Sequence, residues 1–158
     1  MRITRRCCRT IFPLRSKIAA ERGVRRQGGF VPIIEDDVKV AMESFLKDQG
    51  FTSVKVQLGT RQGYDVAGTN PVTGKTLVIE CKGEAKTGSQ HSRSWPNVAS
   101  AILTSLNELE DPLNSNEVAM AFPDTNEYRE RMRLLQPFCK RQGIDVYWVS
   151  ENKSVRKW

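Results

Sequence analysis

The sequence predicts an α/β fold in which a mixed central β-sheet is flanked by helices. Apolar residues recur at helical spacing in three segments, and short apolar runs typical of strands lie between them. A turn at residues 70–74 joins two of these runs as a hairpin, and helix and strand alternate after it. A hairpin half followed by a crossover half favours a mixed sheet. The predicted element order is α-β-β-β-α-β-α-β.

The first half of the chain is expected to hold one helix and three strands. Pro32 suits the first turn of the helix, and Gly50 ends it. Acidic residues occupy the first turn, where the helix dipole favours negative charge. The apolar residues that follow at helical spacing are Val38, Met42, Phe45 and Leu46. The predicted strands are 51–58, 64–68 and 75–82.

A polar loop over 83–96 opens the second half, because this segment shows no apolar period. Asn97 is expected to cap the second helix, which Asp111-Pro112 ends. A buried strand over 117–122 follows.

The third predicted helix begins at Thr125 or Asn126 and ends at Gly143. Pro137 lies within it and is expected to kink or split it, since proline cannot donate a backbone hydrogen bond. Residues 144–149 are expected to form the last strand.

Composition describes a soluble globular protein and narrows the chemistry. Hydrophobic residues make up 39% of the chain, mean hydropathy is −0.48, and no apolar run approaches the roughly 20 residues of a membrane span. None of the 4 cysteines forms a CxxC pair, and His91 is the only histidine. A structural zinc site and a Ser-His-Asp triad are therefore disfavoured. Reduced thiols indicate a cytoplasmic protein.

The basic charge is concentrated in residues 1–30. This segment holds nine Lys or Arg and one Glu, hence +8, so residues 31–158 carry −1 of the total of +7. An arginine-rich arm of this kind would bind nucleic-acid phosphates without sequence preference. A disordered tail, a start codon placed upstream of the true domain and a transit peptide are the alternatives. The chain is thus divided into an arm over 1–30 and a globular domain over 31–158.

The strand region brings two carboxylates and a lysine together at the edge of a sheet, an arrangement that is energetically costly if it serves packing alone. Asp65 begins one apolar run, and Glu80 and Lys82 end the next. Because side chains alternate along a strand, Glu80 and Lys82 share a face. Metal-assisted phosphodiester hydrolysis needs this set, with carboxylates for Mg²⁺ and an ammonium near the attacking water. The simpler alternatives are a turn-forming Asp65 and an ion pair of Glu80 with Lys82 or Lys75.

The order Gly63-Tyr64-Asp65, hairpin, Glu80-Cys81-Lys82 resembles the PD-(D/E)xK nuclease superfamily, most closely its Mrr and archaeal Holliday-junction-resolvase type. The resemblance covers roughly residues 32–150, and Tyr64 takes the place of the motif's proline. Pro123-Asp124 has no Glu-x-Lys after it and is not the motif. The resemblance implies a restriction-endonuclease-like fold and a Mg²⁺- or Mn²⁺-dependent DNA endonuclease.

The resemblance also implies roles for individual residues. Asp65, Glu80 and the main-chain carbonyl of Cys81 would bind the metal, with the Cys81 side chain turned into the core. Lys82 would assist hydrolysis. Family members usually add an acid from the first helix, and Glu35 is favoured for that role over Glu43. Dipole complementation at the helix start is the alternative for Glu35.

The loops beside the motif supply candidate DNA contacts, namely Arg61, Lys86, Gln90 and Arg93. Solvated loop side chains are the alternative for each of them. DNA is the expected partner, and no membrane is involved. The protein could act as a monomer or as a homodimer that cuts both strands. A catalytically inactive module that binds nucleic acid or a partner, or an interaction domain whose triad is an ion-pair network, are the rival functions.

Overall fold

The helices and strands of the computed structural model follow the predicted α/β order, with two differences in the second half. The structure describes residues 31–59 and 63–158, and Val31–Trp158 form one compact unit. Over the described residues the order is α-β-β-β-α-β-α-α-β-β. The elements are α1 (Glu35–Asp48), β1 (Thr52–Val56), β2 (Val66–Thr69), β3 (Thr76–Cys81), α2 (Gln90–Glu110), β4 (Glu117–Pro123), α3 (Asn126–Met132), α4 (Gln136–Gln142), β5 (Ile144–Val149) and β6 (Val155–Lys157).

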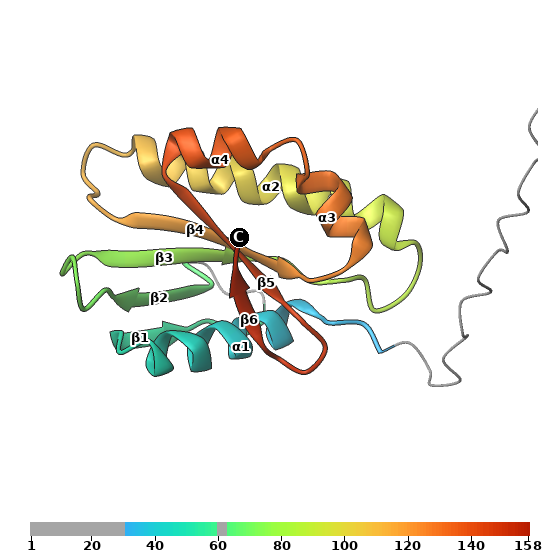
Figure 1. Ribbon diagram of the computed structural model, residues 1–158, viewed down its shortest axis with the longest axis horizontal. Helices are drawn as coiled ribbons and strands as arrows, with labels where there is room; N and C mark the ends of the chain where they lie inside the picture. Colours follow the sequence, from blue (N-terminus) through green and yellow to red (C-terminus); the bar gives the residue numbers. More distant parts are fainter. Residues whose placement is uncertain (1–30, 60–62) are drawn as a thin grey trace, which may run out of the picture. The chain divides into compact units, whose positions relative to one another are not determined.

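The strands form one curled, mixed sheet in the order β1-β2-β3-β4-β5-β6, with α1 on one side and α2, α3 and α4 on the other (Figure 1). The first three strands are antiparallel, β3, β4 and β5 are parallel, and β6 returns antiparallel to β5. The predicted mixed sheet flanked by helices is therefore confirmed. Both parallel connections advance in the same direction across the sheet, so right-handed crossovers place their helices on the same face.

Each face of the sheet has its own apolar core, and β4 shows how alternation divides them. Ala119 and Ala121 face the core under α1, whereas Met120 and Phe122 face the core under α2–α4. The small alanine side chains let α1 pack close to the centre of the sheet. The amphipathic helix α1 buries Val38, Met42 and Leu46 there.

The expected loop over 83–96 is found only over residues 83–89, and the cap at Asn97 is wrong, because α2 begins at Gln90. Ser89 caps it by accepting a hydrogen bond from the Ser92 backbone N–H at 3.4 Å. Pro96 lies inside the helix. It removes one backbone donor and its ring crowds the carbonyl of Ser92, four residues earlier, and packing of the helix offsets that cost. The Asn97 side chain instead donates to the carbonyl of Gly83 at 3.0 Å.

Pro137 splits the third predicted helix, as expected. It lies in the first turn of α4, where its missing N–H costs little, and Gly143 ends α4 with φ of 70°. The prediction that 144–149 is the last strand is wrong, because β6 adds to β5. Strand β6 has three residues, two of them basic, so it is too short and too polar to show the apolar alternation that predicts a strand. Its position follows from pairing with β5 and from Trp158, whose ring packs edge-on against Trp148 at 5.6 Å.

Among the helices of residues 31–59 and 63–158, none has the length and apolar content that a bilayer span requires.

Candidate active site

Asp65 lies immediately before β2, and its carboxylate extends the edge of the β2–β3 ladder. β2 begins at Val66, which pairs with Ile79, so Cys81 lies beyond the last paired residue. The backbone N–H of Cys81 donates to Oδ2 of Asp65 at 2.8 Å instead. This bond fixes Asp65 to the backbone between Glu80 and Lys82.

Lys39, which the sequence analysis did not single out, connects Asp65 to α1. Its Nζ lies 2.6 Å from Oδ1 of Asp65 and 2.9 Å from Oε1 of Glu35, and it donates to the carbonyl of Gly59 at 3.4 Å. The side chain is only 1% exposed. Burial alone would lower the pKa of Lys39, but hydrogen bonds to Asp65 and Glu35 outweigh it and raise that pKa above its ordinary value. Lys39 is thus a buried ammonium held by two carboxylates.

One sequence signal could have found Lys39. It follows Glu35 by four residues, a spacing at which opposite charges meet on a helix surface. It also lies three residues before Met42 and seven before Leu46, on the face that packs against the sheet. A lysine at such a position needs a buried partner, since an unpaired buried charge is costly.

Glu80 and Lys82 form an ion pair at the end of β3, with Lys82 Nζ 2.5 Å from Oε1 of Glu80. The side chains are 17% and 14% exposed, so the pair is accessible to solvent at one edge. The prediction that these two side chains share a face is confirmed. The ion pair is compatible with both the metal-site and the ion-pair interpretations of the sequence.

The charges of the two groups act on each other. Burial raises the pKa of Glu80 above its ordinary value, against the opposing effect of Lys82. The negative charges of Asp65 and Glu35 raise the pKa of Glu80 further. The carboxylates of Asp65 and Glu35 are therefore close enough to Glu80 for their charges to act on it.

The backbone after Lys82 packs tightly against the start of α1. Glu84 and Ile33 exchange two hydrogen bonds, one from the Ile33 N–H to Oε2 of Glu84 at 2.9 Å and one from the Glu84 N–H to the Ile33 carbonyl at 2.8 Å. Tyr128 donates from its hydroxyl to the carbonyl of Gly83 at 2.6 Å. These bonds keep the first turn of α1 beside the end of β3.

Cys81 turns its side chain into the core under α1, as expected. Burial raises the pKa of its thiol well above the ordinary value, so the thiol stays neutral. Along an extended strand the N–H and C=O of one residue point to the same side. Because the Cys81 N–H points at Asp65, its carbonyl is directed to the same side of β3.

Of the two helix acids, the structure brings Glu35 to Asp65 through their shared partner Lys39. Glu43 lies further along α1 and pairs with Lys47 at 2.7 Å on the surface. Glu35, and not Glu43, is therefore the α1 carboxylate that shares a partner with Asp65.

Only some of the side chains that were predicted to contact DNA are exposed to solvent. Lys86 and Arg93 are exposed, in the loop before α2 and in its first turn. The Gln90 amide is engaged in two hydrogen bonds with the backbone of Ala85, both 2.8 Å long, so it holds the loop rather than facing solvent freely. Arg61 lies outside the described residues.

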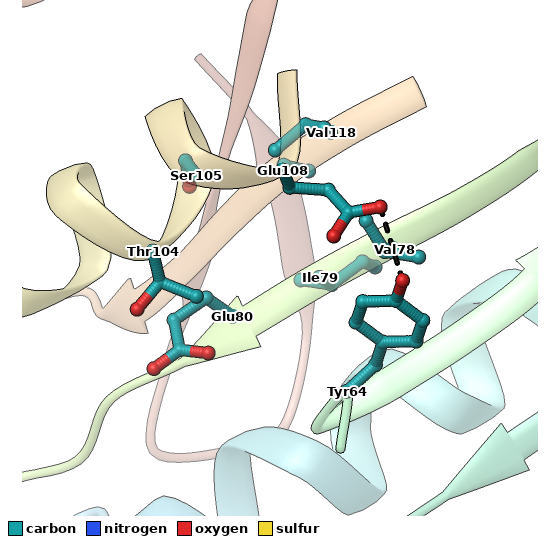
Figure 2. A pocket seen from close by; sticks show the side chains of 9 residues that line it. Tyr64, Val78, Ile79, Glu80, Thr104, Ser105, Glu108 and Val118 are labelled. Carbon is teal, nitrogen blue, oxygen red and sulfur yellow. Dashed lines mark hydrogen bonds between the residues drawn. The ribbon is translucent and has the colours of Figure 1, made fainter. Parts of the chain in front are cut away.

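A small pocket opens beside Glu80, between β3 and α2 (Figure 2). Glu80 lies beside Thr104 in this view, and the Tyr64 hydroxyl donates to Oε1 of Glu108 at 3.0 Å across the pocket. The hydroxyl of Ser105, which also lines the pocket, is buried without a hydrogen-bond partner. The pocket on the α2 side of Glu80 is therefore partly open, and most of its surface is apolar.

The donor atoms at the end of β3 suit a hard cation. Carboxylate oxygens of Asp65 and Glu80 and the carbonyl of Cys81 are the ligand types that Mg²⁺ and Mn²⁺ prefer. Within residues 31–59 and 63–158, no three His, Cys, Asp or Glu side chains are grouped so as to hold a metal ion by themselves. The main-chain carbonyl would therefore have to be the third donor. In this structure Asp65 is paired with Lys39, and Glu80 is paired with Lys82.

Comparison of the chain with protein-family models, with curated proteins and with solved structures found no match.

Proposed function

We propose that this protein is a metal-dependent DNA endonuclease with a restriction-endonuclease-like fold of the PD-(D/E)xK type. The observation that most supports this proposal is the hydrogen bond between Asp65 and the backbone N–H of Cys81. It joins the carboxylate before β2 to the Glu80-Cys81-Lys82 segment, although sixteen residues separate Asp65 and Cys81 in the chain. The mixed sheet, with helices on both faces, is compatible with such a fold.

Asp65, Glu80 and the Cys81 carbonyl would hold Mg²⁺ or Mn²⁺. The ion would supply Lewis-acid stabilisation of the scissile phosphate and a more acidic water. Lys82 would leave Glu80, orient the attacking water and stabilise the negative charge that develops on the phosphate. Glu35 would complete the acidic edge from α1. Products would carry 5′-phosphate ends, and cutting both strands would require two copies or two encounters.

The surface beside the site would contact the DNA backbone. Lys86 and Arg93 are exposed near the end of β3 and would bind phosphates as positive charges. The basic segment 1–30 would add affinity without sequence preference.

A catalytically inactive module that binds nucleic acid or a protein partner is the second candidate. The observation that favours it is that both lysines already pair with the carboxylates, at 2.6 Å for Lys39–Asp65 and 2.5 Å for Lys82–Glu80. Such a network is satisfied without a metal.

Cleavage assays distinguish the two candidates. The purified full chain is incubated with labelled linear, nicked and four-way-junction DNA in Mg²⁺, Mn²⁺ or EDTA. We expect cleavage that needs the metal, about 100-fold or more slower in Glu80→Gln, and lost with DNA binding retained in Lys82→Ala. Glu43→Gln is the matched control, since it neutralises an α1 carboxylate that lies away from the site. Full activity in a pure Glu80→Gln preparation would reject the assignment, and binding without cleavage of any substrate would favour the inactive module.

A further inference from the structure

Lys39 is placed where a cation, rather than an ordinary core side chain, is stabilised. Among the largest fully buried side chains of the described residues it is the charged one, and its ammonium lies between Oε1 of Glu35 and Oδ1 of Asp65. The Gly59 carbonyl supplies a third oxygen at 3.4 Å. Two carboxylates and a carbonyl around one positive charge are also the donor set of a hard divalent ion.

We propose that the Lys39 ammonium is a built-in cation that fills the position between Glu35 and Asp65, so that the site accepts a single divalent metal ion, held on the Glu80 side. This inference rests on the metal site of the proposed function and specifies how that site is regulated. Lys39 is a positioning residue, because it acts through the two carboxylates.

The charge balance of the site supports this role. Glu35, Asp65 and Glu80 carry three negative charges, and Lys39 and Lys82 carry two positive ones. The remaining single negative charge attracts a divalent ion weakly. Removing the Lys39 charge doubles that excess and leaves two carboxylates facing each other without a counter-ion, which a metal ion would relieve.

Metal binding in the absence of DNA tests the proposal. Calorimetric titration with Mn²⁺ is performed on the wild type, Lys39→Ala and Lys39→Gln. We expect about tenfold or greater gain in Mn²⁺ affinity, or one additional bound Mn²⁺, in both variants. Mn²⁺ should also raise the melting temperature of the variants more than that of the wild type. If neither property changes in the variants, the proposal is overturned.

Two matched variants separate a cation position from a general effect of charge. Lys39→Arg keeps the charge and should show no gain. Lys47→Ala removes a lysine with the same four-residue spacing to its partner Glu43, at the surface, and should leave Mn²⁺ binding unchanged. An equal gain in Lys47→Ala would overturn the proposal.

The experiment still decides the proposal if the Lys39 variants do not fold, or if the wild type has no nuclease activity. If the two neutral variants are unfolded without metal, refolding in Mn²⁺ supports the proposal, and failure to refold in Mn²⁺ overturns it. If the wild type cleaves no DNA but the variants gain Mn²⁺, the nuclease proposal fails and the Lys39 inference stands. If the wild type cleaves DNA but the variants gain no Mn²⁺, only the Lys39 inference fails.

Discussion

Gly83 lies so close to Glu35 that a Cβ added at Gly83 would come within 2.0 Å of the Glu35 backbone nitrogen. The next nearest atom, the carbonyl carbon of Ile34, is 2.4 Å away and also belongs to the backbone. Backbone atoms cannot turn aside as a flexible side chain does. The residue after Glu80-Cys81-Lys82 must therefore be glycine for α1 to reach the end of β3, and this close approach holds the two parts of the candidate site together.

Gly83→Ala should consequently destabilise the protein and displace Glu35. We expect a loss of about 3 kcal/mol or more in the free energy of unfolding, measured by urea denaturation, since the helix must move as a unit. Gly88→Ala is the control, because Gly88 has φ of 90° and no atom within 4 Å of the added Cβ. It should cost only the backbone strain of about 1–2 kcal/mol. Equal losses in the two variants would contradict the packing argument.

The Tyr128 hydroxyl provides a second test of the same junction. Tyr128 is 2% exposed, accepts from Nδ2 of Asn97 at 2.7 Å and donates to the carbonyl of Gly83 at 2.6 Å. Tyr128→Phe removes both bonds from a buried position and should cost about 1–2 kcal/mol. Tyr64→Phe removes a hydroxyl bond from a side chain that is 41% exposed and should cost less than about 0.5 kcal/mol. Urea denaturation of the two variants measures the difference. Comparable costs would show that the hydrogen bonds of Tyr128 stabilise the protein no more than an exposed hydrogen bond does.

The sequence predicted the core elements because their signals are local. Helical spacing in α1, the turn at residues 70–74 and the apolar runs of β3, β4 and β5 depend on neighbours within a few residues. The face shared by Glu80 and Lys82 follows from strand alternation alone. The carboxylate of Asp65 and the backbone of Cys81 meet through tertiary pairing, and the sequence did not predict the hydrogen bond between them.

The missed features depend on interactions that no local pattern encodes. Helix α2 continues through Pro96 because its buried residues, including Ser94 and Val98, pack on the sheet and on α3. Strand β6 depends on its partner β5. Lys39 was overlooked because a lysine is ordinarily exposed, and its spacing to Glu35 is equally typical of an exposed ion pair. Its second carboxylate partner, Asp65, lies 26 residues further along the chain.

Asp124 is expected to make stability depend on pH. A hydrogen bond from Arg129 holds the pKa of Asp124 below its ordinary value of 3.8, and Arg156 adds to the effect. A carboxyl whose folded pKa is depressed stabilises the fold above its unfolded pKa, and this contribution is lost as the pH falls through the folded pKa. Asp124→Asn should therefore melt about 2–4 °C below the wild type at pH 7.

The difference between Asp124→Asn and the wild type should shrink as the pH falls below about 3.8 toward the lowered pKa of Asp124 in the folded state, because the wild-type carboxyl becomes neutral there as well. Added salt should reduce it at pH 7, since both arginines are more than half exposed. Calorimetric melting curves from pH 7 to pH 3 measure it. A constant difference over that range would mean that packing, not charge, explains the loss.

Residues 1–30 lie outside the described part of the chain, and their charge supports a separate prediction. The segment carries +8 against −1 for residues 31–158, so its binding to phosphates would supply much of the affinity for DNA. Deleting residues 1–28 should weaken DNA binding and flatten its dependence on salt, by about 0.9 log units of slope for each phosphate that the arm no longer neutralises.

Folding should persist, because Val31–Trp158 form their own compact unit, and cleavage at low salt should persist, because Asp65, Glu80 and Lys82 are retained. Fluorescence anisotropy with labelled duplex DNA at several salt concentrations measures the slope. A truncated protein with unchanged affinity and slope would show that the arm does not bind DNA, and exposed residues of the domain such as Lys86 and Arg93 would then have to hold it.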